Sequence, residues 1–226
     1  MFDTSVIYDL WYYGIEILAF ICAITFHEFM HGFVAFKLGD RTAAGSGRLS
    51  FNPVRHIDPF GTLILPALLL LAGMPVFGYA KPVPFNPNNF EDPKKGELLV
   101  ALAGPFGNLL LAIVGAMLLL GTAGFVGFLP MVAVVYLQMF LQMLIIINLY
   151  LMFFNLIPIP PLDGASIVVP FVPDEHMGTY YTIQQYALPV FMIAIILLPQ
   201  IFNVDPIGWY LSVTAGNVYH LLVGLI

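Results

Sequence analysis

The chain has 226 residues, of which 60% are hydrophobic and 9% are charged, and its mean hydropathy is +0.93. A soluble domain carries roughly 45–50% apolar and about 25% charged residues, so this composition excludes a soluble globular protein and indicates an integral membrane protein. The net charge of −6 contains no long block of one sign, which argues against a nucleic-acid partner.

The first predicted element is a membrane helix over residues 7–37. It is apolar and carries Trp11 and its two tyrosine neighbours near its start, where aromatic residues anchor a helix at the membrane interface. The sequence HEFMH, whose two histidines are four residues apart, lies near the carboxy-terminal end of this helix. Residues 39–60 are rich in Gly, Arg, Asn and Pro and predict a loop, with a short strand at 48–51.

An interrupted apolar stretch follows at residues 61–78. Pro66, Gly73 and Pro75 break it, so it is marginal for a full membrane crossing. The next segment, up to residue 97, contains closely spaced prolines that exclude a helix and favour extended backbone.

Two clear membrane spans are predicted at about 97–121 and 128–156, and the sequence NLIPIPPLDG ends the second abruptly. Apolar residues return at about 183–203 and 206–226, and the last of these could instead lie along the membrane interface. These elements predict an all-α membrane protein, a polytopic bundle of about five to six transmembrane helices, in a single domain over residues 1–226.

The basic residues predict an orientation. All seven Lys and Arg fall between positions 37 and 95, whereas the charged residues near the amino terminus, Asp3, Asp9 and Glu16, are all acidic. The amino terminus is therefore expected on the outer side of the cell membrane. HEFMH then lies nearer the cytosolic face. Because basic residues flank 61–78 on both sides, we expect that stretch to be re-entrant: to dip into the membrane and return.

HEFMH has the spacing of a metal site. His27 and His31 are four residues apart, which places both imidazoles on one helix face within reach of a single metal ion. A catalytic zinc uses three protein ligands and an open position for water, and Glu28 could take that water's proton as general base. The alternative is that the three side chains only form hydrogen bonds to neighbouring helices. An apolar helix makes this alternative weaker, since ionisable groups there are costly and usually functional.

Asp163 in PPLDG is the leading choice for the third metal ligand. The chain must cross the membrane an even number of times between His31 and Asp163 to return to a similar depth, and the spans at 97–121 and 128–156 supply two crossings. This requirement again demands a re-entrant 61–78. Taken alone, an Asp-Gly pair after two prolines would be read as ordinary turn chemistry.

HEFMH in an early membrane helix, followed far downstream by NLIPIPPLDG, resembles the site-2 protease family of intramembrane metalloproteases. GRLSFNPVRHIDPFG, GYAKPVPFNP and AGPFGN extend the resemblance over roughly positions 20–170, in the form of the compact bacterial and archaeal branch without PDZ or CBS domains. The resemblance implies that His27, His31 and Asp163 bind one Zn²⁺ and that Glu28 is the catalytic acid and base. It also implies a catalytic core over about 7–170, with accessory helices over about 183–226.

Two asparagines are candidates for substrate binding or oxyanion support. Asn108 in GPFGN resembles a Gly-Pro-x-x-Asn pattern of the family and could orient a substrate carbonyl, or it could make an interhelical hydrogen bond beside a close-packed Gly104. Asn155 could support the site or only cap a broken helix.

The expected function is zinc-dependent hydrolysis of peptide bonds within or near transmembrane segments of membrane-protein substrates. A substrate must unwind locally to be cut, so segments 48–51 and 78–85 are expected to form a small membrane-associated β-sheet whose edge pairs with it. The rival is a non-catalytic zinc-binding membrane scaffold or transporter, which would have no use for Glu28. The sequence leaves the oligomeric state open, a homo-oligomer included.

Overall fold

The fold consists of helices joined by short irregular segments. The computed structural model describes residues 4–71 and 79–224, and within them the only β-pairing is one isolated bridge. The long helices are α1 (Thr4–Lys37), α4 (Pro93–Gly121), α5 (Met131–Asn155), α6 (Met177–Phe202) and α7 (Pro206–Val223). The short helices are α2 (Thr42–Gly45) and α3 (Leu65–Leu71). The segments of 3-10 helix are η1 (Pro53–Arg55), η3 (Pro87–Asn89), η4 (Thr122–Phe125), η5 (Asp163–Phe171) and η6 (Asp174–His176), and η2 (Pro59–Ile64) is a π-helix.

Three helices of the described residues are long and apolar enough to cross a membrane: Trp11–Lys37, Pro93–Gly124 and Met131–Asn155. They are the spans expected at 7–37, 97–121 and 128–156, and they support a polytopic helical membrane protein. The start of α4 follows from its sequence, because Pro93 stands at the first turn and the Asp92 carboxylate accepts a hydrogen bond from the Lys95 N–H.

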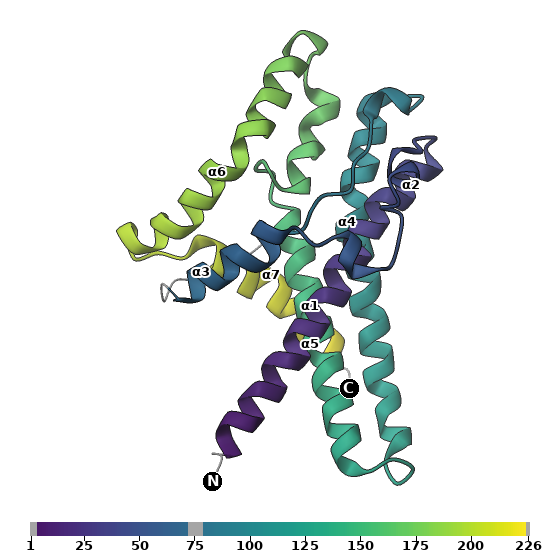
Figure 1. The fold of residues 1–226 in the computed structure, drawn as a ribbon, viewed down its shortest axis with the longest axis vertical. Helices are drawn as coiled ribbons and strands as arrows, with labels where there is room; N and C mark the ends of the chain where they lie inside the picture. The colour runs from purple at the N-terminus through teal and green to yellow at the C-terminus, as the bar shows by residue number, and fades with distance from the viewer. Residues whose placement is uncertain (1–3, 72–78, 225–226) are drawn as a thin grey trace.

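The three spans form the centre of the molecule. α1 runs in one direction, α4 returns, and α5 runs beside α4 in the direction of α1, so that the amino terminus and the α4–α5 connection lie at the same end (Figure 1). Small residues allow close packing between them, as Gly115 shows: a Cβ there would lie 3.0 Å from Ile145 Cγ1. The largest core cluster joins α4, α5 and α7 through Ala112, Ala116, Leu119, Leu141, Ile145, Leu149, Met152 and Ala215.

The segment between α1 and α4 leaves the bundle and comes back to the same place. Tyr79 N–H donates to Gly61 O at 3.1 Å, and the Thr62 hydroxyl donates to Tyr79 O at 2.9 Å. Tyr79 therefore lies beside Gly61 and Thr62, at the start of the apolar stretch. Residues 72–78, the far part of the stretch expected to be re-entrant, lie outside the described residues. Because α4 and α5 then make two passes, the chain after α5 returns to the level of HEFMH (Figure 1).

The small β-sheet expected from 48–51 and 78–85 is wrong for the described residues, which here begin at 79. Residues 49–51 form bends, Arg48 has no regular structure, and residues 79–86 have neither helix nor strand. The physical reason is that most backbone donors of 79–84 are already used or missing. The N–H groups of Tyr79, Lys81 and Val83 donate to other parts of the chain, and prolines at 82 and 84 have none.

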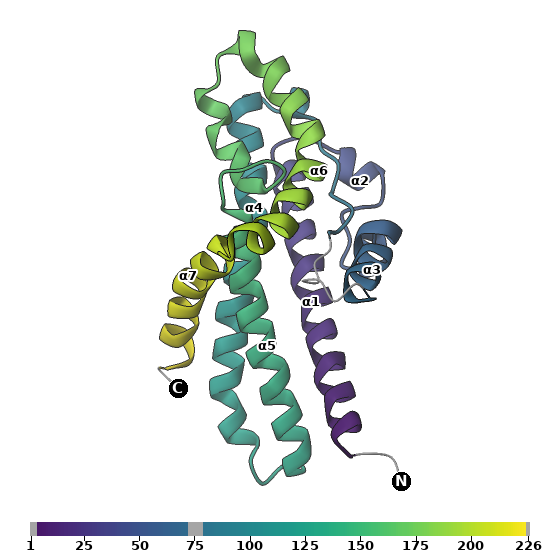
Figure 2. The ribbon, with the colours of Figure 1, turned by 90° about the vertical axis from the view of Figure 1, so that its left-hand side faces the viewer.

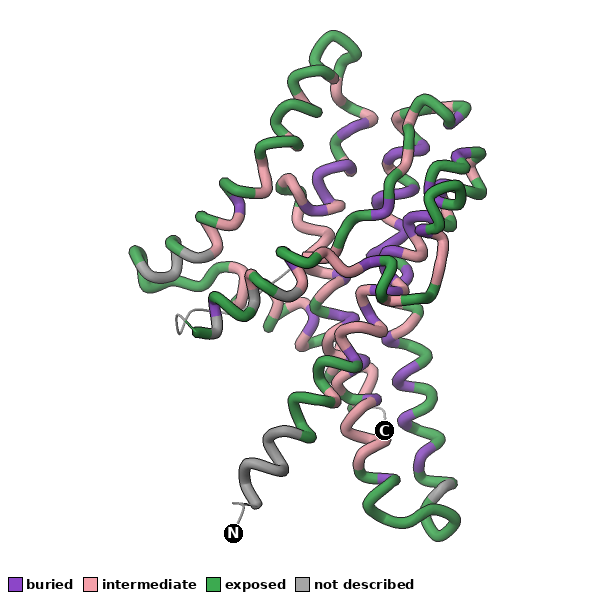
Figure 3. The backbone as a smooth tube through the Cα atoms, in the orientation of Figure 1, coloured by how far each residue is buried: buried purple, intermediate pink, exposed green. Residues whose placement is uncertain are grey.

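The two carboxy-terminal helices differ in how they pack. α7 runs along α5, as Figure 2 shows, and places Ala215 in the core. α6 extends away from the bundle, and most of its described residues are exposed or half-buried (Figure 3). The burial in Figure 3 is concentrated where α1 and α4 meet.

Candidate metal centre and active site

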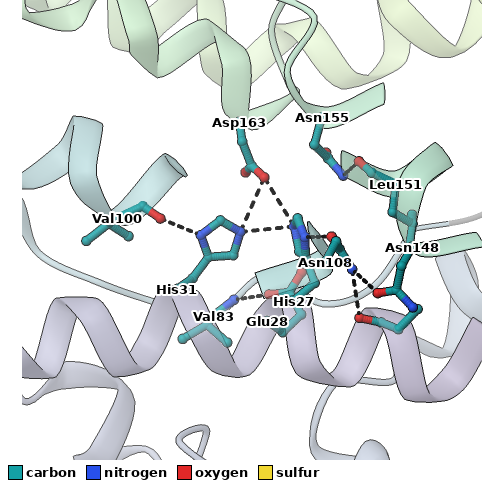
Figure 4. A network of polar contacts seen from close by, with 11 residues as sticks. His27, Glu28, His31, Val83, Val100, Asn108, Asn148, Leu151, Asn155 and Asp163 are labelled. Atoms are coloured by element: carbon teal, nitrogen blue, oxygen red, sulfur yellow. Dashed lines mark hydrogen bonds and ion pairs between the residues drawn. The ribbon is translucent and has the colours of Figure 1, made fainter. Parts of the chain in front are cut away.

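Three side chains from two distant parts of the chain converge on one point. The Nε2 atoms of His27 and His31 lie 3.0 Å apart, and Asp163 Oδ2 lies 3.1 Å from the first and 3.3 Å from the second (Figure 4). Both imidazoles are buried, because α4 covers this face of α1. These three residues form a group that could hold a metal ion.

The other nitrogen of each ring is bound to α4. His31 Nδ1 lies 2.7 Å from Val100 O, and His27 Nδ1 lies 2.6 Å from Asn108 Oδ1. A main-chain carbonyl can only accept, and the Asn108 amide nitrogen is bound elsewhere, so Nδ1 carries the hydrogen in both rings. The lone pair of each neutral imidazole is then on Nε2 and points toward Asp163.

This arrangement fits a metal ion better than a hydrogen-bond network. Two Nε2 lone pairs and a carboxylate oxygen face one another, and Asp163 Oδ2 is buried without a hydrogen-bond partner in the described residues. Three acceptors so close together repel unless a cation lies between them. Zinc bonded tetrahedrally at about 2.0–2.1 Å would separate its ligand atoms by about 3.3 Å, close to the three distances observed. Three ligands leave the fourth position open.

Asp163 reaches the site because α5 ends at Asn155. After Asn155 the prolines at 158, 160 and 161 prevent the helix from continuing, and the chain turns back into η5, which begins at Asp163. Gly164 is required at the next position, since a Cβ there would lie 2.4 Å from Ile157 O. The Asp-Gly pair is thus both a turn and the means of presenting the carboxylate.

Gly104 is the point at which α4 approaches the two rings. A Cβ at this position would lie 2.4 Å from His31 Nε2 and 2.5 Å from His27 Cε1. Any larger residue would therefore occupy the space where the ligand atoms meet. The neighbouring Gly107 has a similar role against α1, where a Cβ would lie 2.6 Å from Met30 Cγ.

Glu28 is buried beside His27, and its carboxylate is held from one side. Oε2 accepts a hydrogen bond of 2.9 Å from the main-chain N–H of Val83, in the connection before α4 (Figure 4). Within the described residues no hydrogen bond occupies Oε1. One oxygen is thus fixed and the other is free to exchange a proton, which is the arrangement that a general base needs.

The two asparagines assigned to substrate binding occupy different positions. Asn108 is fully buried, and its amide nitrogen donates to Asn148 Oδ1 at 2.8 Å and to Ala23 O at 3.3 Å. Both hydrogens are thus committed, and the role visible in the structure is the interhelical one weighed as the alternative. Asn155 donates to Leu151 O within its own helix at 3.0 Å and makes no hydrogen bond to the ligands.

Asn148 was missed by sequence reasoning. It is fully buried, donates to Leu144 O at 2.7 Å, and accepts the amide of Asn108 that orients His27. A signal existed, because it is an isolated amide within the apolar run LIIINLYL of α5, and a polar side chain in such a place is usually functional.

Glu97 was also missed. This buried carboxylate of α4 accepts hydrogen bonds from Ser166 of η5 at 3.3 Å and from the Tyr181 hydroxyl of α6 at 2.7 Å. It therefore ties the element that carries Asp163 to α4. From sequence alone Glu97 looked like the polar edge of a span, because it follows two lysines.

The comparisons with known proteins agree with this chemistry. The sequence model described as peptidase family M50 matches residues 126–198, which include Asp163. The chain is 36% identical over 208 residues to the candidate zinc metalloprotease YwhC of Bacillus subtilis (strain 168), covering 92% of this chain and 88% of that protein. It is 32% identical over 198 residues to the candidate zinc metalloprotease Rip2 of Mycobacterium tuberculosis (strain H37Rv), covering 87% and 70%. No solved structure matches the chain significantly.

Proposed function

The chain belongs to peptidase family M50, the site-2 protease family, and from this premise we propose that it is a zinc-dependent intramembrane endopeptidase. It hydrolyses peptide bonds within or near transmembrane segments of membrane-protein substrates. The observation that carries the proposal is the convergence of His27, His31 and Asp163 beside the half-held carboxylate of Glu28.

One zinc ion per chain would be held by the Nε2 atoms of His27 and His31 and by the Asp163 carboxylate. Bound there, zinc supplies a Lewis acid that polarises the scissile carbonyl and lowers the pKa of a water molecule to about 7. Val100 O and Asn108 Oδ1 keep both rings in the tautomer that offers Nε2.

Glu28 is proposed to move the proton. Its free Oε1 takes a proton from the attacking water and later delivers it to the leaving amine, as general base and then general acid. The Val83 N–H holds Oε2 during both steps. A site that only stores or scaffolds a metal has no use for such a group, so Glu28 also separates the protease from the rival scaffold or transporter.

The reaction is proposed to take place below the lipid surface. His27 and His31 belong to the apolar span Trp11–Lys37, and their partners on α4 belong to the span Pro93–Gly124. With every Lys and Arg between positions 37 and 95, the amino terminus is outside and the site lies nearer the cytosolic face. The meeting of Tyr79 with Gly61 supports a re-entrant 61–78, which would bring water toward the site.

A single experiment tests the proposal. The protein is purified in detergent, its zinc content is measured, and cleavage of candidate single-span membrane proteins is followed for the parent and for Glu28→Gln. We expect about one zinc in both proteins and a loss of cleavage of roughly 10²- to 10⁴-fold in the variant. Equal activity of the two would refute the role of Glu28, and a zinc-loaded parent that cuts no membrane protein would favour the scaffold or transporter.

A further inference from the structure

A buried arginine lies on the far side of the segment that contacts Glu28. Arg48 is 8% exposed and follows α2 in the loop after the first span. Its Nη1 donates to Arg55 O, and its Nη2 donates to Lys81 O and, at 3.2 Å, to Pro82 O. No carboxylate pairs with it in the described part of the chain. Its hydrogen bonds therefore go to main-chain carbonyls, and two of these carbonyls, those of Lys81 and Pro82, belong to residues 79–86, which we call the strap.

One peptide group joins this arginine to the proposed base. The Pro82 carbonyl accepts from Arg48, and the N–H of the same planar peptide unit, that of Val83, donates to Glu28 Oε2 at 2.9 Å. A cation at the oxygen end of a peptide polarises it and strengthens the donor at the nitrogen end. Arg48 and Glu28 are thus coupled through the Pro82–Val83 peptide although they do not touch.

The strap is seated closely on α1 at this point. Gly32, one turn after Glu28, leaves room for Val83: a Cβ at Gly32 would lie 3.1 Å from Val83 Cγ1. The ends of the strap are fixed separately, by Tyr79 on Gly61 and by the Asn86 N–H on Asp40 at 2.9 Å. Between those ends, Arg48 donates side-chain hydrogen bonds to the middle of the strap, on the side opposite Glu28.

We propose that Arg48 is a positioning residue for peptide hydrolysis: it holds the Pro82–Val83 peptide so that the Val83 N–H fixes one oxygen of Glu28 and leaves the other free to exchange the proton. The inference rests on the proposed function, and it assigns a role to a residue outside the group that could hold the metal. Arg48 acts on the position of the base and leaves the zinc ligands untouched, so its loss should change the chemical step and spare both zinc binding and substrate binding.

The test compares Arg48→Gln with Arg55→Gln, a matched control in the same loop whose exposed side chain makes no hydrogen bond in the described residues. We expect R48Q to retain about one zinc and an unchanged KM, with kcat lowered roughly 10- to 100-fold, since a small misplacement of a catalytic group has that effect. R48K should recover part of the loss, because an ammonium keeps the charge without the fork that reaches several carbonyls. R55Q should behave like the parent.

A second measurement follows the hydrogen bond between the strap and Glu28, and it requires no substrate. Proline lacks an N–H, so Val83 is the only exchangeable amide of residues 82–84, and hydrogen–deuterium exchange over this stretch reports its bond to Glu28. Exchange should be faster in R48Q and unchanged in R55Q. Val83→Pro, which deletes the N–H, should lower kcat as R48Q does. The kcat of the double variant should lie within about threefold of that of the less active single variant, because both substitutions remove the same interaction.

The outcomes separate the two hypotheses. The role of Arg48 is overturned if R48Q shows both unchanged amide exchange and unchanged kcat. It is also overturned if R48Q loses zinc, or if its KM rises by the same factor by which kcat falls. Should R48Q not fold, the same readouts on R48K decide. If the parent cuts nothing while R48Q still exchanges faster than R55Q, the proposed function fails and the anchoring of the strap by Arg48 stands.

Discussion

Asn108 Oδ1 lies 2.6 Å from His27 Nδ1, although 81 residues separate the two in the chain. The amide nitrogen of the same asparagine is bound to Ala23 O and to Asn148 Oδ1, so the oxygen cannot turn away from the ring. Three helices thereby determine which nitrogen of His27 faces the metal centre. The consequence is that zinc affinity depends on side chains that never touch the metal.

Asn108→Ala should therefore weaken zinc binding by roughly 10- to 100-fold, the usual effect of removing the partner of a ligating histidine. Competition with a chelator measures this directly. Asn155→Ala is the matched control, because that amide donates only to its own helix, and its zinc affinity should stay close to the parent's. If N108A bound zinc like the parent and lost only cleavage, Asn108 would be a substrate contact instead.

Gly104→Ala should abolish zinc binding or reduce it severely. The added Cβ would lie 2.4 Å from His31 Nε2 and 2.5 Å from His27 Cε1, so at least one ring must leave its position. Gly121→Ala, at the end of the same helix, meets nothing within 4 Å and should leave the zinc content unchanged. A zinc-loaded, active G104A protein would contradict the site geometry described above.

Removal of the metal should lower thermal stability, because zinc binds the folded centre and the unfolded chain has no such centre. At a free zinc concentration of about 100 times Kd, the expected gain is about 2.7 kcal/mol over the chelated protein. The melting temperature in detergent, with chelator and after zinc is added back, measures this gain. Asp163→Ala should show little zinc-dependent shift, and a shift as large as the parent's would remove Asp163 from the ligand set.

Asp40, just after the carboxy-terminal end of α1, should make stability depend on pH. Its burial raises the pKa, but hydrogen bonds outweigh it and hold the pKa of this carboxyl below its usual value. They come from the side chains of Thr42 and Asn89, both at 2.6 Å, and from the N–H groups of Asn86 at 2.9 Å and Thr42 at 3.1 Å. Because the folded-state pKa is lowered, the stabilisation is complete above the unfolded value of about 3.9 and is lost as pH falls through the folded value.

Asp40→Asn should accordingly destabilise the protein at pH 7, by about 2 kcal/mol for the hydrogen bonds to a charged group that it disrupts. The difference from the parent should shrink below about pH 4. Thermal unfolding at several pH values tests this, with Glu91→Gln, an exposed acid nearby, as the control. A D40N deficit that persists unchanged at low pH would show that the charge of Asp40 contributes nothing.

The sequence by itself determined the membrane-span helices and predicted the three residues, His27, His31 and Asp163, that the structure brings together as a possible metal site. Apolar length predicted α1, α4 and α5 because a membrane helix must satisfy its backbone internally and hide it from lipid. The four-residue spacing of His27 and His31 is a local property of one helix, and the need for an even number of crossings was enough to bring Asp163 to the same level.

Only the tertiary structure decided which groups surround that centre. Asn108, Asn148, Gly104 and Glu97 act across helix interfaces, and an interface depends on how helices rotate and pack, which periodicity does not reveal in a helix that is apolar on every side. The expected β-sheet failed for a related reason: strand-like composition in residues 79–86 says nothing about where the backbone hydrogens go. Those of Tyr79, Lys81, Val83 and Asn86 go to Gly61, His56, Glu28 and Asp40. A segment that crosses buried polar groups finds its hydrogen-bond partners there and not in another strand.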